Sequence, residues 1–106
     1  MAARDQQGYV GIHNDRYGGM TPIGGLIKDA WVFAILPEDE TCEGWTRQQL
    51  QQLHEQVAAA WDRHGLRVAN LPPELRERHT RIHDAAIARA RELGWVPGAD
   101  VDPEME

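Results

Sequence analysis

Apolar residues recur at helical spacing in three stretches of the chain. The first stretch follows Thr21 and Pro22, which suit a helix N-cap and a proline at the first helical position. Its apolar positions are Ile23, Leu26, Ile27, Ala30, Trp31 and Ala34, and Pro37 is expected to end the helix. Gly24 and Gly25 would weaken this helix by about 1 kcal/mol each relative to alanine. A buried strand over 30–36 is the alternative, but the spacing favours a helix.

The second stretch carries clear start and stop signals. Thr46 and Gln49 have the spacing of a capping box, and Gly65 suits a left-handed C-cap. These signals predict a helix between Thr46 and Gly65. Its apolar stripe consists of Leu50, Leu53, Val57 and Trp61.

A third helix is predicted between Pro72-Pro73-Glu74 and Gly94, because proline and an acid suit its first turn and glycine suits its end. Its inner face would hold Leu75, His79, Ile82, Ala86 and Leu93. Two pairs have the i,i+4 spacing of solvated ion pairs, namely Glu74 with Arg78 and Glu77 with Arg81.

Together these elements predict a mainly α fold, a small three-helix domain with a glycine-rich N-terminal arm. The arm covers 1–21, the helical domain 22–95 and an acidic flexible tail 96–106. We expect the two later helices to form an antiparallel hairpin that the element around Trp31 closes. That element is apolar on nearly every side over 30–36, so it should lie centrally or in a homodimer interface. The alternative is an α+β fold with short strands at 8–13 and 30–36.

Composition narrows the class of protein. The 106 residues suffice for one domain, and 42% hydrophobic with 26% charged residues is ordinary for a globular chain. Cys42 is the single cysteine, which excludes a disulfide within the chain and fits a reducing compartment. The N-terminus lacks an apolar leader, and the longest apolar run is too short to span a bilayer. These features predict a soluble cytoplasmic domain without a membrane partner.

The net charge of −6 is concentrated in two short segments. One follows the first predicted helix and contains Glu38, Asp39, Glu40 and Glu43. The other is the tail, with Asp100, Asp102, Glu104 and Glu106. No segment concentrates positive charge, which argues against a nucleic-acid partner. Acidic neighbours also disfavour the thiolate of Cys42, so this cysteine is expected to be a poor nucleophile.

Four histidines, His54, His64, His79 and His83, are candidate metal ligands. On helical wheels they lie on or beside the apolar stripes of the second and third predicted helices. His79 and His83 are four residues apart, so one helix could present both to one divalent metal ion. The zinc-protease motif is absent because it requires glutamate at the position of Thr80, and three arginines nearby oppose a cation, namely Arg76, Arg78 and Arg81. Buried histidines without a metal, or a pH-responsive cluster, are the alternatives.

The arm supplies a second candidate site. Polar residues on glycine-rich loops often bind ligands, and the arm offers His13, Asn14, Arg16 and Tyr17. A plain surface turn is the alternative.

No catalytic signature is present in the sequence. The leading hypothesis is therefore a non-enzymatic accessory or protein-interaction domain without a cofactor, whose partner is another protein or a second copy of the chain. The alternative is a metal-dependent small enzyme or sensor built on the histidines. A small-molecule site in the arm is a third hypothesis.

Overall fold

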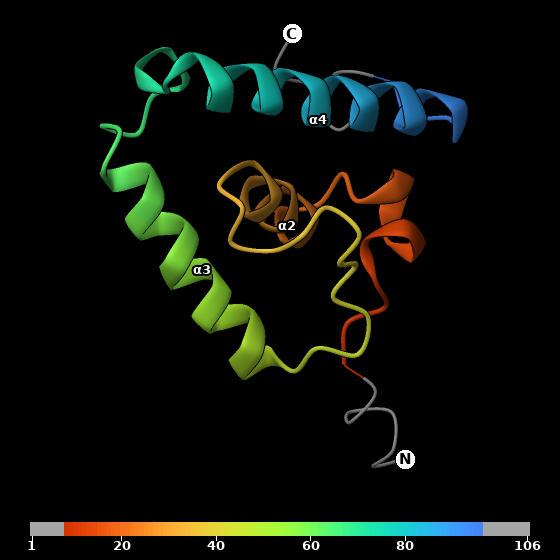
Figure 1. The fold of residues 1–106 in the computed structure, drawn as a ribbon. Coiled ribbons are helices and arrows are strands. Elements are labelled where there is room, and N and C mark those ends of the chain that lie inside the picture. Colours follow the sequence, from red (N-terminus) through yellow and green to blue (C-terminus); the bar gives the residue numbers. More distant parts are fainter. Residues whose placement is uncertain (1–7, 97–106) are drawn as a thin grey trace, which may run out of the picture.

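A computed structural model describes residues 8–96, and three α-helices form its framework (Figure 1). They are α2 (Pro22–Val32), α3 (Arg47–Asp62) and α4 (Pro73–Glu92). Single 3-10 turns precede and connect them: η1 (Ile12–Asn14), η2 (Arg16–Gly18) and η3 (Val68–Asn70). The mainly α prediction is confirmed. The alternative with strands at 8–13 and 30–36 is wrong, since neither segment forms a strand. Residues 1–7 of the predicted arm and 97–106 of the predicted tail lie outside the described residues.

The start of α2 is as predicted, but its end is not. The Thr21 hydroxyl accepts a hydrogen bond from the Gly24 amide at 3.0 Å, and Pro22 opens the helix. The helix then ends at Val32, five residues before Pro37. Ala34 adopts a left-handed conformation with φ 58°, and the amide of the next residue donates back to the Ala30 carbonyl at 2.9 Å. The chain therefore turns out of the helix without needing the proline.

The predicted N-cap of α3 and the predicted C-cap of α4 are present, whereas α3 ends at Asp62 with Arg63 as its C-cap, two residues before the predicted Gly65. At the start of α3, the Gln49 amide donates to the Thr46 hydroxyl at 3.1 Å, and the Gln49 side chain accepts from the Thr46 amide at 2.8 Å. At the end of α4, Gly94 has φ 101° and the amide of Trp95 donates to the Ala90 carbonyl at 2.9 Å. The inner face of α4 is only partly as predicted, because Leu93 is 45% exposed.

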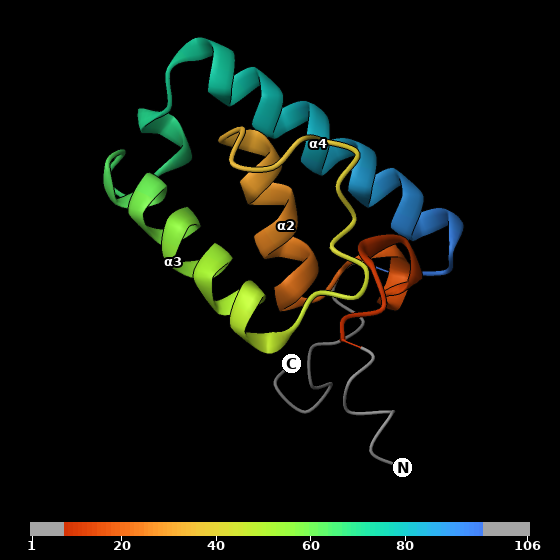
Figure 2. The ribbon, with the colours of Figure 1, turned by 60° about the horizontal axis from the view of Figure 1, so that its bottom comes forward.

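The predicted hairpin of α3 and α4 does not form. Instead, α2 lies between the other two helices, and α3 and α4 diverge from their connection (Figures 1 and 2). Helix α2 packs against both neighbours, and its Ile27 and Ala30 are completely buried. The apolar character of α2 on most sides explains this arrangement, since a helix that must bury two faces is stable between two partners. The expectation of a central position for this element is therefore confirmed.

The core joins the N-terminal arm, α2, the loop before α3 and α3 itself. Its buried members are Ile12, Ile27, Ala30, Cys42, Leu53 and Val57. Ile12 comes from the N-terminal arm, whose backbone also binds the loop before α3: the Tyr9 amide donates to the Trp45 carbonyl at 2.9 Å, and the Gly44 amide donates to the Tyr9 carbonyl at 2.7 Å. Gly11, with φ 94°, turns the chain before a strand can extend. Among the described helices, none combines the length and the apolar character needed to cross a membrane.

Candidate functional site

Asp29 connects all three helices. It lies on α2, and its two carboxylate oxygens have different partners. Trp61 of α3 donates its indole N–H to Oδ2 at 3.1 Å, while Nε2 of His83 on α4 lies 3.1 Å from Oδ1. Both Asp29 and His83 are about one-quarter exposed at the side chain, so solvent reaches one side of this contact.

His79 completes a group of three possible metal ligands. It lies one turn before His83 on α4, and the two imidazole centroids are 4.2 Å apart with an angle of 30° between their planes. One ligand atom each from Asp29, His79 and His83 all lie within 4.8 Å of one another. We call these three residues the Asp-His-His group. Their ligand atoms need to approach by about 1 Å to surround a zinc ion at its usual ligand distances of roughly 2.0–2.2 Å.

Aromatic rings cover the apolar side of this group. Trp61 meets the His79 ring edge-on at 6.1 Å and the Phe33 ring edge-on at 5.1 Å. The resulting burial lowers the pKa of His79, and the neighbouring His83 lowers it further, while the carboxylates of Asp29 and Asp84 oppose both effects. His79 is therefore neutral at neutral pH, the form in which imidazole binds a metal ion.

The structure brings together only part of the predicted histidine set. His64 is separated from the group by Phe33, on which its ring stacks at 5.9 Å with a 9° tilt. His54 is exposed on α3, and among the described residues it belongs to no group of potential metal ligands. Asp29 was not predicted as a ligand. The signal for it was an acidic residue one position before Ala30, in a helix whose only other charged residue is Lys28.

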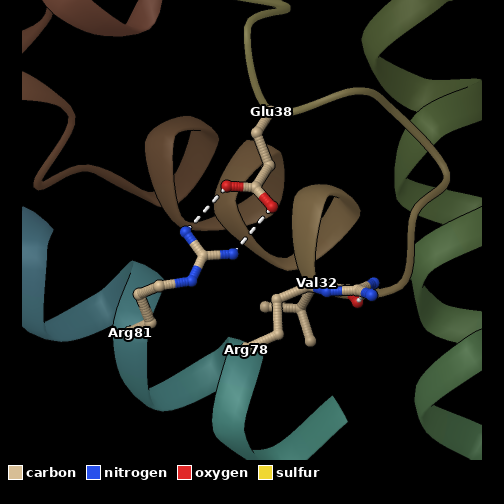
Figure 3. Close-up of polar contacts among 4 residues, drawn as sticks. All are labelled: Val32, Glu38, Arg78 and Arg81. Atoms are coloured by element: carbon tan, nitrogen blue, oxygen red, sulfur yellow. Dashed lines mark hydrogen bonds and ion pairs between the residues drawn. The ribbon is translucent and has the colours of Figure 1, made fainter. Parts of the chain in front are cut away.

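Two of the three arginines expected to oppose a cation are bound to other groups. Arg78 donates Nη1 to the Val32 carbonyl at 2.9 Å, and Arg81 binds both carboxylate oxygens of Glu38 at 2.9 and 2.8 Å (Figure 3). The predicted helical pairs of these arginines with Glu74 and Glu77 are thus replaced by contacts to the end of α2 and the loop after it. Arg76 is exposed.

The candidate binding residues of the arm make mainly local contacts. Asn14 donates to the Val10 carbonyl at 3.1 Å, and the guanidinium of Arg16 lies 5.7 Å from the centre of the Tyr17 ring. Tyr17 has a left-handed backbone, with φ 50°. His13 is exposed and is the member of this set that lines a cavity.

Cys42 lies in the loop between α2 and α3 and is buried within the core. Burial raises the pKa of its thiol to about 11, and the nearby carboxylate of Glu40 contributes to the increase. The thiol is therefore protonated at neutral pH and is a poor nucleophile. Acidic neighbours in the sequence indicated the same behaviour, but burial is the larger cause.

An open groove of about 640 Å³ runs between α2 and α3. Its lining is mainly apolar and comprises Pro22, Gly25, Leu26, Asp29, His54, Val57, Ala58, Trp61, Leu66 and Val68. Leu66 is 69% exposed and Val68 is 38% exposed, so apolar surface continues at this end of the groove. Because Asp29 and Trp61 also line it, the groove meets the Asp-His-His group.

Searches against protein-family models, curated proteins and solved structures find no match to this chain. Its function is therefore inferred from the residues of the site.

Proposed function

We propose that this chain is a small binding domain for a divalent transition-metal ion, with Asp29, His79 and His83 as its protein ligands. The observation that carries the proposal is the convergence of the three ligand atoms within 4.8 Å, although Asp29 lies on α2 and both histidines lie on α4. Two imidazoles and one carboxylate suit zinc and similar ions better than magnesium or calcium, which prefer oxygen ligands alone.

The surroundings of the group support metal binding in two ways. The indole of Trp61 holds one oxygen of Asp29, which leaves the other oxygen directed toward His83. Such outer contacts fix the orientation of metal ligands. Three protein ligands also leave a tetrahedral ion with one position for water or another molecule. The partial exposure of the group gives solvent access to that position.

A bound ion would connect α2 to α4, and its binding free energy would stabilise the folded chain. This consequence favours a sensing or structural role, in which the metal changes the stability of the domain. Cys42 is buried in the core and its thiol is protonated, so it does not serve as a nucleophile at the metal site.

Zinc titration of the chelator-treated chain, followed by calorimetry, tests the proposal. We expect one ion per chain and a loss of affinity of about tenfold or more for His79→Gln and for His83→Gln. His54→Gln is the matched control, since His54 lies on α3 outside the group, and it should bind zinc like the unaltered chain. Equal zinc binding by the His79→Gln/His83→Gln double variant and the unaltered chain would overturn the proposal.

The groove between α2 and α3 favours a second candidate function, the protein-interaction role expected from the sequence. Its apolar lining and the exposed Leu66 suit the apolar face of one amphipathic helix from a partner protein. A volume of about 640 Å³ accommodates a few anchoring side chains of such a helix rather than the face of a whole second domain.

Leu66→Asp tests the interaction role without altering the Asp-His-His group. We expect the variant to retain its affinity for zinc. Its affinity for an amphipathic helical peptide that binds the unaltered chain should be lost. Light scattering provides a further check, because a dimer that Leu66→Asp dissociates would identify a second copy as the occupant and contradict the partner-helix proposal.

A further inference from the structure

Lys28 is a buried cation without a strong partner among the described residues. It lies on α2 and is only 4% exposed. Within residues 8–96, the one polar atom within hydrogen-bond distance of its ammonium is the thioether sulfur of Met20, at 3.6 Å. A thioether is a weak acceptor, whereas an ammonium group has three protons to donate. Burial of such a charge is costly unless an opposite charge or strong acceptors accompany it.

The carboxylates of Asp29 and Asp15, whose charges act on Lys28, are already engaged by other groups. Asp29 binds Trp61 and His83. Asp15 accepts from the hydroxyl groups of Tyr9 and Thr21. No ion pair of Lys28 occurs among residues 8–96.

Lys28 lines a cavity of about 220 Å³ between the arm, α2 and α4. The other walls are mainly apolar and include Ile12, Trp31, Ile82, Ala85 and Ala86. Charged residues also line the cavity, but two of them neutralise each other: Arg81 and Glu38 form the paired contact seen in Figure 3. Arg89 is paired with Glu92, and both of these side chains are about two-thirds exposed. Lys28 is therefore the buried positive charge of this cavity.

We infer that this cavity binds a small organic monocarboxylate with an apolar body. The carboxylate would accept hydrogen bonds from the Lys28 ammonium and supply the missing negative charge. The apolar walls would cover the rest of the molecule. A hydrated inorganic anion fits less well, because it offers these walls only polar surface. The cavity is smaller than the roughly 300–1,000 Å³ of sites for drug-sized molecules, which limits the ligand to a few carbon atoms or one ring.

This inference is independent of the metal site. The ligand class follows from Lys28 and the cavity walls, and none of the residues in the Asp-His-His group lines this cavity. His13, a candidate binding residue in the sequence, does line it and supplies a polar group at its arm side.

Binding of sodium benzoate, compared with benzamide, tests the inference on the full chain after chelator treatment. The two probes have nearly the same shape, but only benzoate carries a charge. Nuclear magnetic resonance titration is the readout, with the amide signals of Ile82, Ala85 and Ala86 as reporters of the cavity. We expect saturable shifts of these signals with benzoate and about tenfold weaker binding of benzamide.

Two variants distinguish the contribution of the Lys28 charge to binding from that of the cavity's shape. Lys28→Met keeps the apolar stem and should abolish the preference for benzoate over benzamide. Ala86→Phe fills the cavity without removing the charge and should weaken both probes. A thermal unfolding curve for each variant confirms that it folds, and if one does not, the other variant still tests the inference. Equal binding of the two probes, no saturable shift with either probe, or an unchanged preference in Lys28→Met would overturn it.

Discussion

Gly24 of α2 packs directly on the backbone of Gly19 in the arm. A Cβ atom on Gly24 would stand 2.0 Å from the Gly19 carbonyl oxygen, far inside van der Waals contact. At Gly25, one position later, a Cβ would meet nothing within 4 Å. Close packing therefore requires glycine at position 24 but not at position 25, although both glycines weaken the helix in the same way.

Alanine substitutions at these two positions should change the free energy of unfolding in opposite directions. Gly25→Ala is expected to raise the free energy of unfolding by about 0.5–1 kcal/mol, since it improves the helix and meets open space. Gly24→Ala is expected to lower it by about 1–3 kcal/mol, because the arm must move away from α2. Urea unfolding of both variants measures the difference. Similar effects of the two substitutions would contradict the close packing of the arm on α2.

The two arginines of Figure 3 should differ in their importance for stability. Arg78 is half-buried and satisfies the Val32 carbonyl at the end of α2, so Arg78→Gln is expected to cost about 1–2 kcal/mol. Arg81 and Glu38 are both largely exposed, and exposed ion pairs contribute little. Arg81→Gln should therefore leave the urea midpoint almost unchanged. A larger loss for Arg81→Gln than for Arg78→Gln would reverse this ranking.

Protonation of Asp15 at acidic pH should lower the free energy of unfolding. Burial raises the pKa of this carboxyl, but hydrogen bonds from Thr21, Tyr9 and the Arg16 amide, together with the Arg16 charge, lower it by more, so the pKa lies below its ordinary value of 3.8. The unfolded chain consequently binds the proton more readily than the folded chain. The contribution is fully present above the unfolded pKa of about 4 and is lost as pH falls through the lower, folded pKa.

Asp15→Asn provides the test of this pH dependence. We expect the variant to be less stable than the unaltered chain by about 1 kcal/mol at pH 7, with the difference shrinking below pH 4. Asp39→Asn, at an exposed carboxylate, is the control and should show little difference at either pH. A constant difference for Asp15→Asn between pH 7 and pH 3 would be inconsistent with the hydrogen bonds described.

Trp61→Phe should weaken the proposed metal site without removing a ligand. The substitution retains an aromatic ring beside Phe33 but removes the N–H that holds Asp29. We expect zinc affinity to fall by about tenfold, the usual effect of losing a contact that orients a ligand. Trp45→Phe alters a tryptophan in the loop just before α3 and serves as the control. Unchanged zinc affinity in Trp61→Phe would show that the indole does not position the carboxylate.

Features set by neighbouring residues were predictable from the sequence. The capping box of Thr46 and Gln49 and the cap at Gly94 depend on side chains within a few positions of the helix end. The end of α2 was not predictable in this way, because it relies on a left-handed alanine, Ala34, in place of the usual glycine. Nothing in the local sequence favours that conformation, and the packing of the following turn imposes it.

The order of packing and one of the three candidate ligands, Asp29, depended on distant residues. The i,i+4 spacing of His79 and His83 indicated that they face the same way, and the structure brings them together. The pairing of His83 with Asp29 spans 54 positions and follows from the central position of α2. The hairpin prediction had placed α3 against α4. Helical periodicity identifies an apolar face but does not specify its partner.

The central position of α2 also determines how the domain should open. Because α3 and α4 each pack mainly on α2, the loss of either one uncovers an apolar face of the central helix. Partial opening is therefore costly on both sides, and the three helices should unfold in one cooperative step. The backbone amides of Ile27 and Ala30 should then be among the slowest in the chain to exchange with deuterium, at the rate set by global unfolding.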